Sequence, residues 1–136
     1  EVLTARDNIA VPLVAAGMSG GDAGEAADRA LASVGLHEHA GHLAEELSGG
    51  QRQRVAVARG LALSSLRLAA GSLVLLADEP TGNLDPATGE QIIELLFELN
   101  AEAGTALVLV THDTTLAARC AAIYRLSAGV LARSAA

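Results

Sequence analysis

Residues 73–85 read LVLLADEPTGNLD, and the architecture of the chain can be worked out from this segment. Five apolar residues, Leu73 to Ala77, run without a break into two adjacent carboxylates, Asp78 and Glu79. An unbroken apolar run bounded by turn residues is typical of a strand that is buried on both faces of a parallel sheet. Pro80 cannot continue a central strand, so the strand is expected to end where the carboxylates begin.

Asp78 and Glu79 are therefore expected at the carboxyl end of a central strand, the edge at which open α/β sheets bind their ligands. Two neighbouring carboxylates are costly to bury without a partner. A cation offsets that cost, and Mg²⁺ with phosphates suits hard oxygen ligands. An ordinary buried strand with an acidic exit loop is the structural alternative, and these residues alone leave both interpretations open.

The residues that follow predict a βαβ unit with parallel strands. A turn at Asp85-Pro86 precedes an amphipathic helix that we expect to be capped at Thr88 and to end near Gly104. Its apolar face, at helical spacing, consists of Ile92, Leu95, Leu96 and Leu99. Thr105 to Val110 reads as a second buried strand. His112 follows this strand, so we expect it to lie beside Asp78 and Glu79 at the same edge of the sheet.

Two further segments, one nearer each end of the chain, also allow structural predictions. Gly17 to Gly24 lacks the Lys and Ser/Thr of a phosphate loop, so we interpret it as a linker. Asp22 is expected to cap the helix that follows and to form a capping box with Glu25. Near the C-terminus we expect a short helix at 115–120, and a hairpin with strands at 123–126 and 130–133.

A second glycine-containing segment, Leu47-Ser48-Gly49-Gly50-Gln51, predicts a helix start. Ser48 is an N-cap candidate, and Gln51 three residues later completes a capping box. Two glycines in a first helical turn are poor helix formers, but they allow close approach to the backbone. Free N–H groups and the helix macrodipole form an anion site, so we expect this turn to face a phosphate. The structural alternative is a plain cap.

Composition limits the possible functions. The chain has 136 residues, 51% of them hydrophobic, which is enough for one domain with a sizeable core. All nine basic residues are Arg, and the net charge of -7 argues against a general nucleic-acid surface.

The single cysteine, Cys120, is expected to be a small buried hydrophobe. Three histidines in HEHAGH (37–42) invite a metal interpretation, but their spacing favours a solvated loop.

Three stretches resemble, in this order, hallmark motifs of ABC-transporter ATP-binding cassettes. LSGGQRQRVAVARGLA (47–62) resembles the signature motif, LVLLADEPTGNLD (73–85) the Walker B strand with its D-loop, and LVTHD (109–113) the H-loop. DEPTGNLD and LTARDNIAVPL (3–13) are most similar to cassettes of lipoprotein-releasing and macrolide-export transporters. The resemblance implies an α/β, P-loop NTPase-like fold with a mostly parallel sheet flanked by helices. Residues 1–62 would form a helical signature region and 73–136 the core strands of a single, partial domain.

The resemblance also implies ligands and a role for each site residue. Asp78 would hold Mg²⁺, Glu79 would act as general base on water, and His112 would contact the γ-phosphate of ATP. The other nucleotide contacts would come from Ser48, Gly49, Gly50 and Gln51 of the signature and from Asp85 of the D-loop. Because the signature serves ATP bound to the opposite cassette, a second cassette is an implied partner.

A membrane permease is also an implied partner, and nucleic acid is not. The protein would be cytoplasmic and peripheral on the inner face of the membrane.

The departure from the family pattern is the phosphate loop, which the sequence does not contain, together with its Lys. We therefore expect a C-terminal portion of a cassette that is inactive alone. Leu63–Ser72 is longer than the usual connector. Besides an ABC-transporter ATPase subunit, two hypotheses remain: a truncated cassette that binds a partner without hydrolysis, and a cassette ATPase acting on DNA or ribosomes.

Overall fold

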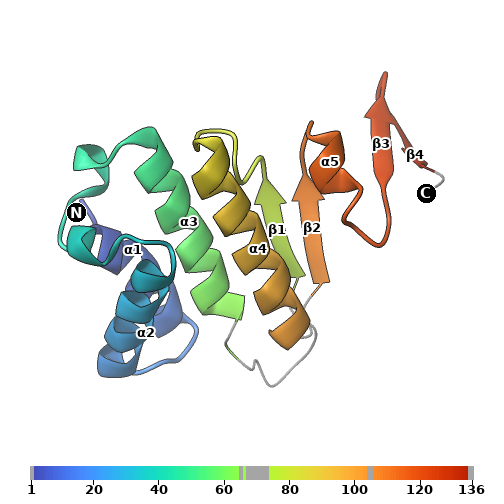
Figure 1. Ribbon diagram of the computed structural model, residues 1–136. Helices are drawn as coiled ribbons and strands as arrows, with labels where there is room; N and C mark the ends of the chain where they lie inside the picture. The colour runs from blue at the N-terminus through green and yellow to red at the C-terminus, as the bar shows by residue number, and fades with distance from the viewer. Residues whose placement is uncertain (1, 65, 67–73, 104–105, 135–136) are drawn as a thin grey trace.

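A computed structural model describes residues 2–64, 66, 74–103 and 106–134 (Figure 1). Its helices are α1 (Ala5–Ala15), α2 (Gly20–Ser33), α3 (Gly49–Ser64), α4 (Pro86–Ala103) and α5 (Thr114–Ala117), with 3₁₀ turns η1 (His37–His39) and η2 (Ala44–Glu46). Its strands are β1 (Val74–Asp78), β2 (Ala106–Val110), β3 (Tyr124–Ser127) and β4 (Val130–Arg133). Helices α1 to α3 form one end of the molecule, and the β3–β4 hairpin forms the other (Figure 1).

Strands β1 and β2 pair in parallel, in a register that runs from Val74 opposite Ala106 to Asp78 opposite Val110. Helix α4 connects them, so the predicted strand–helix–strand unit is confirmed. The fold class, α/β with a parallel sheet and a separate group of helices, is also confirmed. Much of the long connector at Leu63–Ser72 lies outside the described residues.

The prediction that these strands are buried on both faces is wrong for the described chain. Helices α3 and α4 lie over one face of the sheet, and Leu75 and Leu107 on that face pack against the core (Figure 1). On the other face Leu76 is 74% exposed and Val110 57% exposed. An apolar run indicates that a strand is suited to burial, but it does not show what covers the strand. In the described part of the chain no helix or strand covers the outer face of the β1–β2 sheet.

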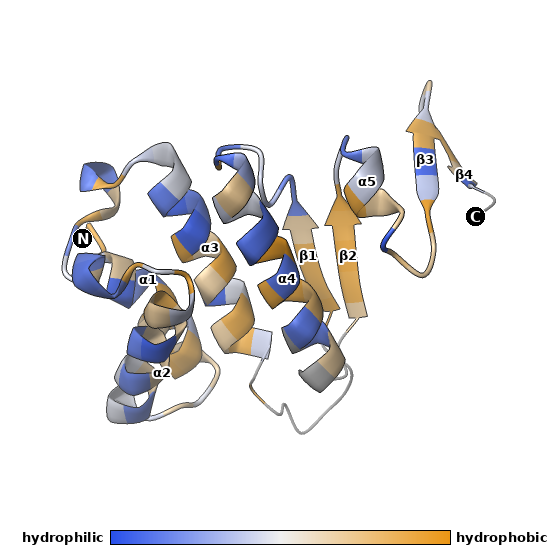
Figure 2. Ribbon diagram, viewed as in Figure 1, coloured by the Kyte–Doolittle hydropathy of each residue, from blue (hydrophilic) through white to orange (hydrophobic). Residues whose placement is uncertain are grey.

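Colouring by hydropathy distinguishes the strands of the parallel sheet from the helices (Figure 2). Strands β1 and β2 are apolar along most of their length, whereas α2 and α4 alternate between polar and apolar residues (Figure 2). Such alternation is what a helix needs to present one face to a core and the other to water. Among the described residues no helix has the length and apolarity needed to cross a membrane.

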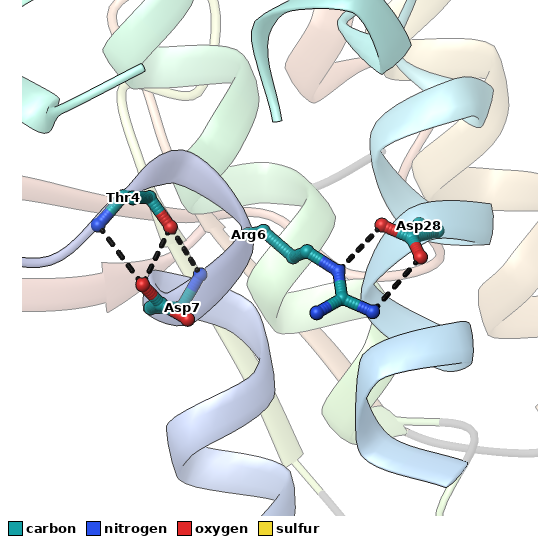
Figure 3. Close-up of polar contacts among 4 residues, drawn as sticks. All are labelled: Thr4, Arg6, Asp7 and Asp28. Carbon is teal, nitrogen blue, oxygen red and sulfur yellow. Dashed lines mark hydrogen bonds and ion pairs between the residues drawn. The ribbon is translucent and has the colours of Figure 1, made fainter. Parts of the chain in front are cut away.

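Helices α1, α2 and α3 enclose the main core. Its largest fully buried side chains are Ile9 and Leu13 of α1, Leu31 of α2, Leu36 after α2, and Leu96 of α4. A two-pronged ion pair joins α1 to α2: Arg6 Nε donates to Asp28 Oδ1 at 2.8 Å, and Nη2 donates to Oδ2 at 3.0 Å (Figure 3). The hydrogen bonds between the two side chains, and then their opposite charges, raise the pKa of Arg6 and lower the pKa of Asp28 from their usual values.

The expected linker at Gly17–Gly24 is wrong from Gly20 onward, because α2 begins there. Ser19, not Asp22, is the N-cap, and its hydroxyl accepts from the Asp22 backbone N–H at 3.2 Å. Gly24 lies under Arg6: a Cβ at this position would come within 2.5 Å of the guanidinium. The glycine therefore marks a crossing between two helices, and the sequence pattern alone could not distinguish that from a loop.

The cap of α4 is also different from the prediction. Asp85 precedes the helix, and its Oδ1 accepts from the backbone N–H of Thr88 at 3.0 Å, so Asp85 rather than Thr88 satisfies the first turn. The predicted short helix after β2 is present as α5, although it ends at Ala117. The terminal hairpin is confirmed, with β3 and β4 antiparallel about Ala128-Gly129.

Candidate active site

The predicted meeting of the two strand ends is present between Glu79 and His112. Glu79 Oε1 accepts from His112 Nδ1 at 2.8 Å and from the His112 backbone N–H at 3.0 Å. The two residues are 33 positions apart in sequence, and only the parallel pairing of β1 and β2 brings them together. The His112 side chain is 86% exposed and that of Glu79 38%, so a ligand can reach the pair.

The backbone of Glu79 is unusual. Its φ of 44° lies in the left-handed region, which an L-residue with a long side chain rarely adopts. Its N–H donates to Val110 O at 2.9 Å, and its C=O accepts from Gly82 N–H at 3.1 Å and from Gln53 Nε2 at 3.0 Å. Strained backbone that is fixed by several contacts is a recurrent feature of functional sites.

The two side chains change one another's protonation. The hydrogen bond from His112 lowers the pKa of Glu79, and the same bond raises the pKa of His112 above its usual 6.5. Glu79 is therefore ionised at neutral pH, and His112 carries more positive charge there than an isolated histidine. With Nδ1 bound to Glu79, Nε2 is the ring nitrogen left for a ligand.

Asp78 is the last residue of β1, one position before Glu79, and its side chain is exposed at the carboxyl end of the strand. Its oxygens suit Mg²⁺, which takes one or two protein carboxylates and completes its shell with water and phosphate oxygens. The described residues contain no group of three or more His, Cys, Asp or Glu placed to hold a metal ion. Asp78 alone fits a metal that arrives with a nucleotide, and does not fit an all-protein metal cage.

The second predicted site, the turn at Ser48, has the expected cap. Ser48 Oγ accepts from the Gln51 backbone N–H at 3.2 Å, and Gln51 Oε1 accepts from the Ser48 backbone N–H at 2.8 Å. Ser48 and Gly49 are exposed, and a Cβ on Gly49 would meet no atom within 4 Å. The first turn of α3 is therefore open to a ligand at Gly49.

Gly50 has a different environment from Gly49. A Cβ at this position would lie 3.0 Å from the carbonyl oxygen of Asn83, in the segment that follows Glu79. The close approach that we expected at this glycine is therefore made by the same chain. Asp85 ends that segment, and hydrogen bonds from Thr88 lower the pKa of its carboxylate. The contact between α3 and the 79–85 segment fixes the two predicted site regions relative to one another.

Sequence reasoning missed Gln53 as a site residue. Gln53 connects α3 to Glu79, as described above, and its position could have been inferred from helical spacing. Gln53, Val57 and Gly60 stand at i, i+4 and i+7, and Gly60 packs so closely on β1 that a Cβ would lie 3.0 Å from Leu75 Cδ1.

The solvated loop that we expected for the three histidines is present in part, because His37 and His42 are exposed. Residues His37–His39 form the 3₁₀ turn η1, and His39 is half-buried. His39 Nε2 lies 3.0 Å from Gln51 Nε2, which supports the first turn of α3, and its ring is 5.1 Å from that of His42. Gln51 therefore connects the Ser48 turn to this histidine.

Taken together, the parallel strands β1 and β2 with polar carboxyl ends and the capped helix α3 beside them define an α/β protein with a candidate ligand-binding edge. The family model described as ABC transporter matches residues 1–82. The chain therefore belongs to the ABC transporter family, which confirms the family inferred from the motifs.

The chain is also similar to three curated ATP-binding proteins. The chain is 45% identical over 129 residues to the uncharacterised ABC transporter ATP-binding protein YbbA of Escherichia coli (strain K12), covering 95% of this chain and 54% of YbbA. It is 45% identical over 128 residues to the lipoprotein-releasing system ATP-binding protein LolD of Legionella pneumophila (strain Paris), covering 94% and 53%. It is 40% identical over 129 residues to the macrolide export ATP-binding/permease protein MacB of Psychrobacter cryohalolentis, covering 95% and 18%.

Solved structures agree with this assignment. The dimeric structure of MJ0796, a bacterial ABC transporter cassette, matches with a TM-score of 0.81 at 41% identity, covering 93% of this chain and 53% of that chain. A post-hydrolysis dimer of MJ0796 bound to ADP and Pi matches with a TM-score of 0.82 at 38% identity, covering 96% and 56%. The chain spans about half the length of YbbA, LolD and MJ0796, so it corresponds to part of a cassette.

Proposed function

We propose that the whole protein is the ATP-binding subunit of an ABC transporter and hydrolyses ATP. The observation that carries this proposal is the Glu79 carboxylate held by both the ring and the backbone N–H of His112, at the carboxyl end of parallel strands. Phosphoryl transfer needs mainly positioning and electrostatic stabilisation. A fixed, ionised carboxylate beside an exposed imidazole supplies both.

Each side chain has a specific task in the proposed reaction. Glu79 accepts a hydrogen bond from the attacking water, and its lowered pKa keeps it ionised to do so. His112 donates from Nε2 to the γ-phosphate, and its raised pKa favours the charged donor. Asp78 would hold Mg²⁺, which neutralises phosphate charge when bound. Each of these groups lies at the same edge of the β1–β2 sheet.

The signature turn acts on a second molecule in this proposal. Ser48 and Gly50, with Gly49 and Gln51 completing the turn, would contact the γ-phosphate of ATP bound to the opposite cassette, and Asp85 would lie at the interface. In the part of the chain that the structure describes, no hydrogen bond joins Ser48 to Asp78, Glu79 or His112. The solved MJ0796 cassettes are dimers, which supports a paired arrangement.

The coupling partner is a membrane permease, with the cassette cytoplasmic and bound to the inner face of the membrane. The supporting observation is the sequence identity of 45% to LolD and 40% to MacB, whose names describe lipoprotein release and macrolide export. The division into a signature region at 1–62 and core strands at 73–136 belongs to the same proposal. Co-purification with nucleic acid or ribosomes instead of a permease would contradict it.

The test is ATP hydrolysis by the complete protein and its Glu79→Gln variant. We expect the variant to bind ATP while its turnover falls at least about a hundredfold, because general-base groups contribute that much or more. Glu90→Gln, on the exposed side of α4, is the matched control and should keep its activity. Normal hydrolysis by Glu79→Gln would exclude the assigned role of Glu79.

Two further measurements test the composite site. Ser48→Arg should prevent ATP-driven dimerisation, since its long side chain fills the open first turn of α3; sedimentation with Mg²⁺ and ATP measures this. The 136-residue chain by itself should show no appreciable turnover, because it has no Lys to grip the β- and γ-phosphates. Turnover by the chain alone that disappears in Glu79→Gln would contradict that expectation.

A further inference from the structure

The segment Gln51-Arg52-Gln53-Arg54 at the start of α3 contacts four different parts of the molecule. Gln51 contacts His39, Arg52 donates to Leu47 O, and Arg54 Nη1 donates to Val34 O at 3.1 Å. These three contacts stay within the helical end of the molecule. Gln53 is different, because its Nε2 donates across to Glu79 O at 3.0 Å, 26 residues away in sequence.

The contact made by Gln53 falls on the most constrained residue of the site. Glu79 has a φ of 44°, and its C=O has two donors, Gly82 N–H from its own turn and Gln53 Nε2 from α3. The Gly82 bond belongs to the same short turn as Glu79 and moves with it. Of the contacts described for the Glu79 main chain, the bond from Gln53 is therefore the one that anchors it to a helix.

Helix α3 can serve as a firm anchor at this point. Val57, one turn beyond Gln53, is buried, and Gly60 on the same face lies against Leu75 of β1. Gly50, at the helix start, lies against Asn83. The helix therefore contacts the polypeptide on both sides of Glu79, and its position relative to β1 is set by close packing as well as by the Gln53 bond.

We propose that Gln53 is a positioning residue for Glu79: its bond to the Glu79 carbonyl holds the left-handed backbone that points the carboxylate at His112. The proposal rests on the function proposed above for Glu79. It adds that the helix carrying Ser48 also sets the geometry of the carboxylate that acts on water. The Gln53 bond adds a polar link between the helix and Glu79 to the packing at Gly50 and Gly60.

The test compares Gln53→Met, which keeps the length of the side chain and removes the N–H donor, with Gln91→Met on the exposed side of α4. In the complete protein we expect Gln53→Met to lower kcat about three- to tenfold, the range that one net hydrogen bond supports. The KM for ATP should stay within about twofold, because the lost bond positions Glu79, which acts on water, and does not contact the nucleotide. Gln53→Lys, which keeps a donor, should retain more activity than Gln53→Met.

Hydrogen exchange gives a second readout that does not depend on turnover. In Gln53→Met the amides of Gly82 and His112, which both bond to Glu79, should exchange about three- to tenfold faster than in the wild type. The amide of Leu31 in α2 should not change. Gln91→Met should leave all three rates unaltered.

The outcomes separate the two proposals. If Glu79→Gln abolishes turnover but Gln53→Met has the kcat of Gln91→Met, Gln53 has no positioning role and the inference is wrong while the proposed function stands. If the wild type does not hydrolyse ATP, the proposed function fails. Exchange at Gly82 and His112 then decides whether Gln53 holds Glu79: equal rates in Gln53→Met and Gln91→Met overturn the inference in that case also.

Discussion

The helical end of the molecule and the β1–β2 sheet differ in how completely their apolar side chains are buried. In the helical end, α1, α2 and α3 bury Ile9, Leu13 and Leu31 entirely. In the sheet, one face packs on α3 and α4 while Leu76 and Val110 on the other remain exposed. The helical end therefore buries its large apolar side chains, whereas the sheet that carries Glu79 and His112 presents an apolar surface to its surroundings.

The largest expected effect comes from truncating a leucine in each region. Leu31→Ala should lower the free energy of unfolding by about 2–5 kcal/mol, since a fully buried leucine leaves a cavity. Leu76→Ala, on the open face, should change it by about 0.5 kcal/mol or less. Urea unfolding of the chain measures both. If Leu76→Ala lowered the free energy of unfolding strongly, and more so at higher protein concentration, copies of the chain would cover the open face. That result would contradict the difference between the two regions.

A smaller effect on the free energy of unfolding is expected at the N-cap of α1, in the helical end of the molecule. Thr4 Oγ1 accepts from the Asp7 backbone N–H at 3.1 Å, and Asp7 Oδ2 accepts from the Thr4 backbone N–H at 3.4 Å (Figure 3). Thr4→Ala should therefore cost about 1 kcal/mol. Thr4→Ser, which retains the hydroxyl, is the matched control in the same unfolding experiment. Equal losses in the two variants would assign the effect to packing of the methyl group.

The smallest effect on stability is expected at the open edge, where the Glu79–His112 pair is exposed. Because the pKa of His112 is raised, the pair contributes below the usual histidine value of 6.5 and the contribution is lost as pH rises through the higher folded pKa. Because the pKa of Glu79 is lowered, the contribution is also lost as pH falls below the usual value of 4.5 and through the folded pKa.

NMR titration of His112 tests that assignment directly. The pKa of His112 should lie above 6.5 in the wild type and fall back toward 6.5 in Glu79→Gln, which removes the carboxylate. An unchanged titration in the variant would mean that the two side chains do not interact in solution. The side-chain contact would then not contribute to the order of the exposed edge of the sheet.

Much of the fold could be predicted from local sequence patterns. Apolar runs bounded by turn residues located β1 and β2, and helical spacing located α4. The carboxylates after β1 identified the edge of the sheet at which His112 lies. The errors came where a glycine or a cap has a tertiary reason. Gly24 permits Arg6 to cross α2, and Asp85 takes the capping role that Thr88 also fits by spacing.

The candidate site was predicted as a set of residues but not as a connected structure. The motifs identified Glu79 and His112, and helical spacing could have placed Gln53 on the sheet-facing side of α3. The positive φ of Glu79 and the bond from Gln53 to its carbonyl could not be read from the sequence. Backbone conformation at a strand end depends on contacts from distant elements, which periodicity does not encode. The burial of β1 was overestimated for a similar reason, because hydrophobicity does not reveal what covers a face.

The parallel pairing of β1 and β2 has a consequence for how the chain folds. The bonds between Glu79 and His112 close a loop of 33 residues, longer than the 22 residues that separate Arg6 from Asp28. Loop-closure entropy disfavours the longer loop slightly, so the Arg6–Asp28 contact is expected to form before the Glu79–His112 pair. Pulse-labelling would then record protection at Ile9 before His112. Until the strands pair, their apolar segments are open to association with other nascent chains, and the efficiency of assembly depends on how briefly that state persists.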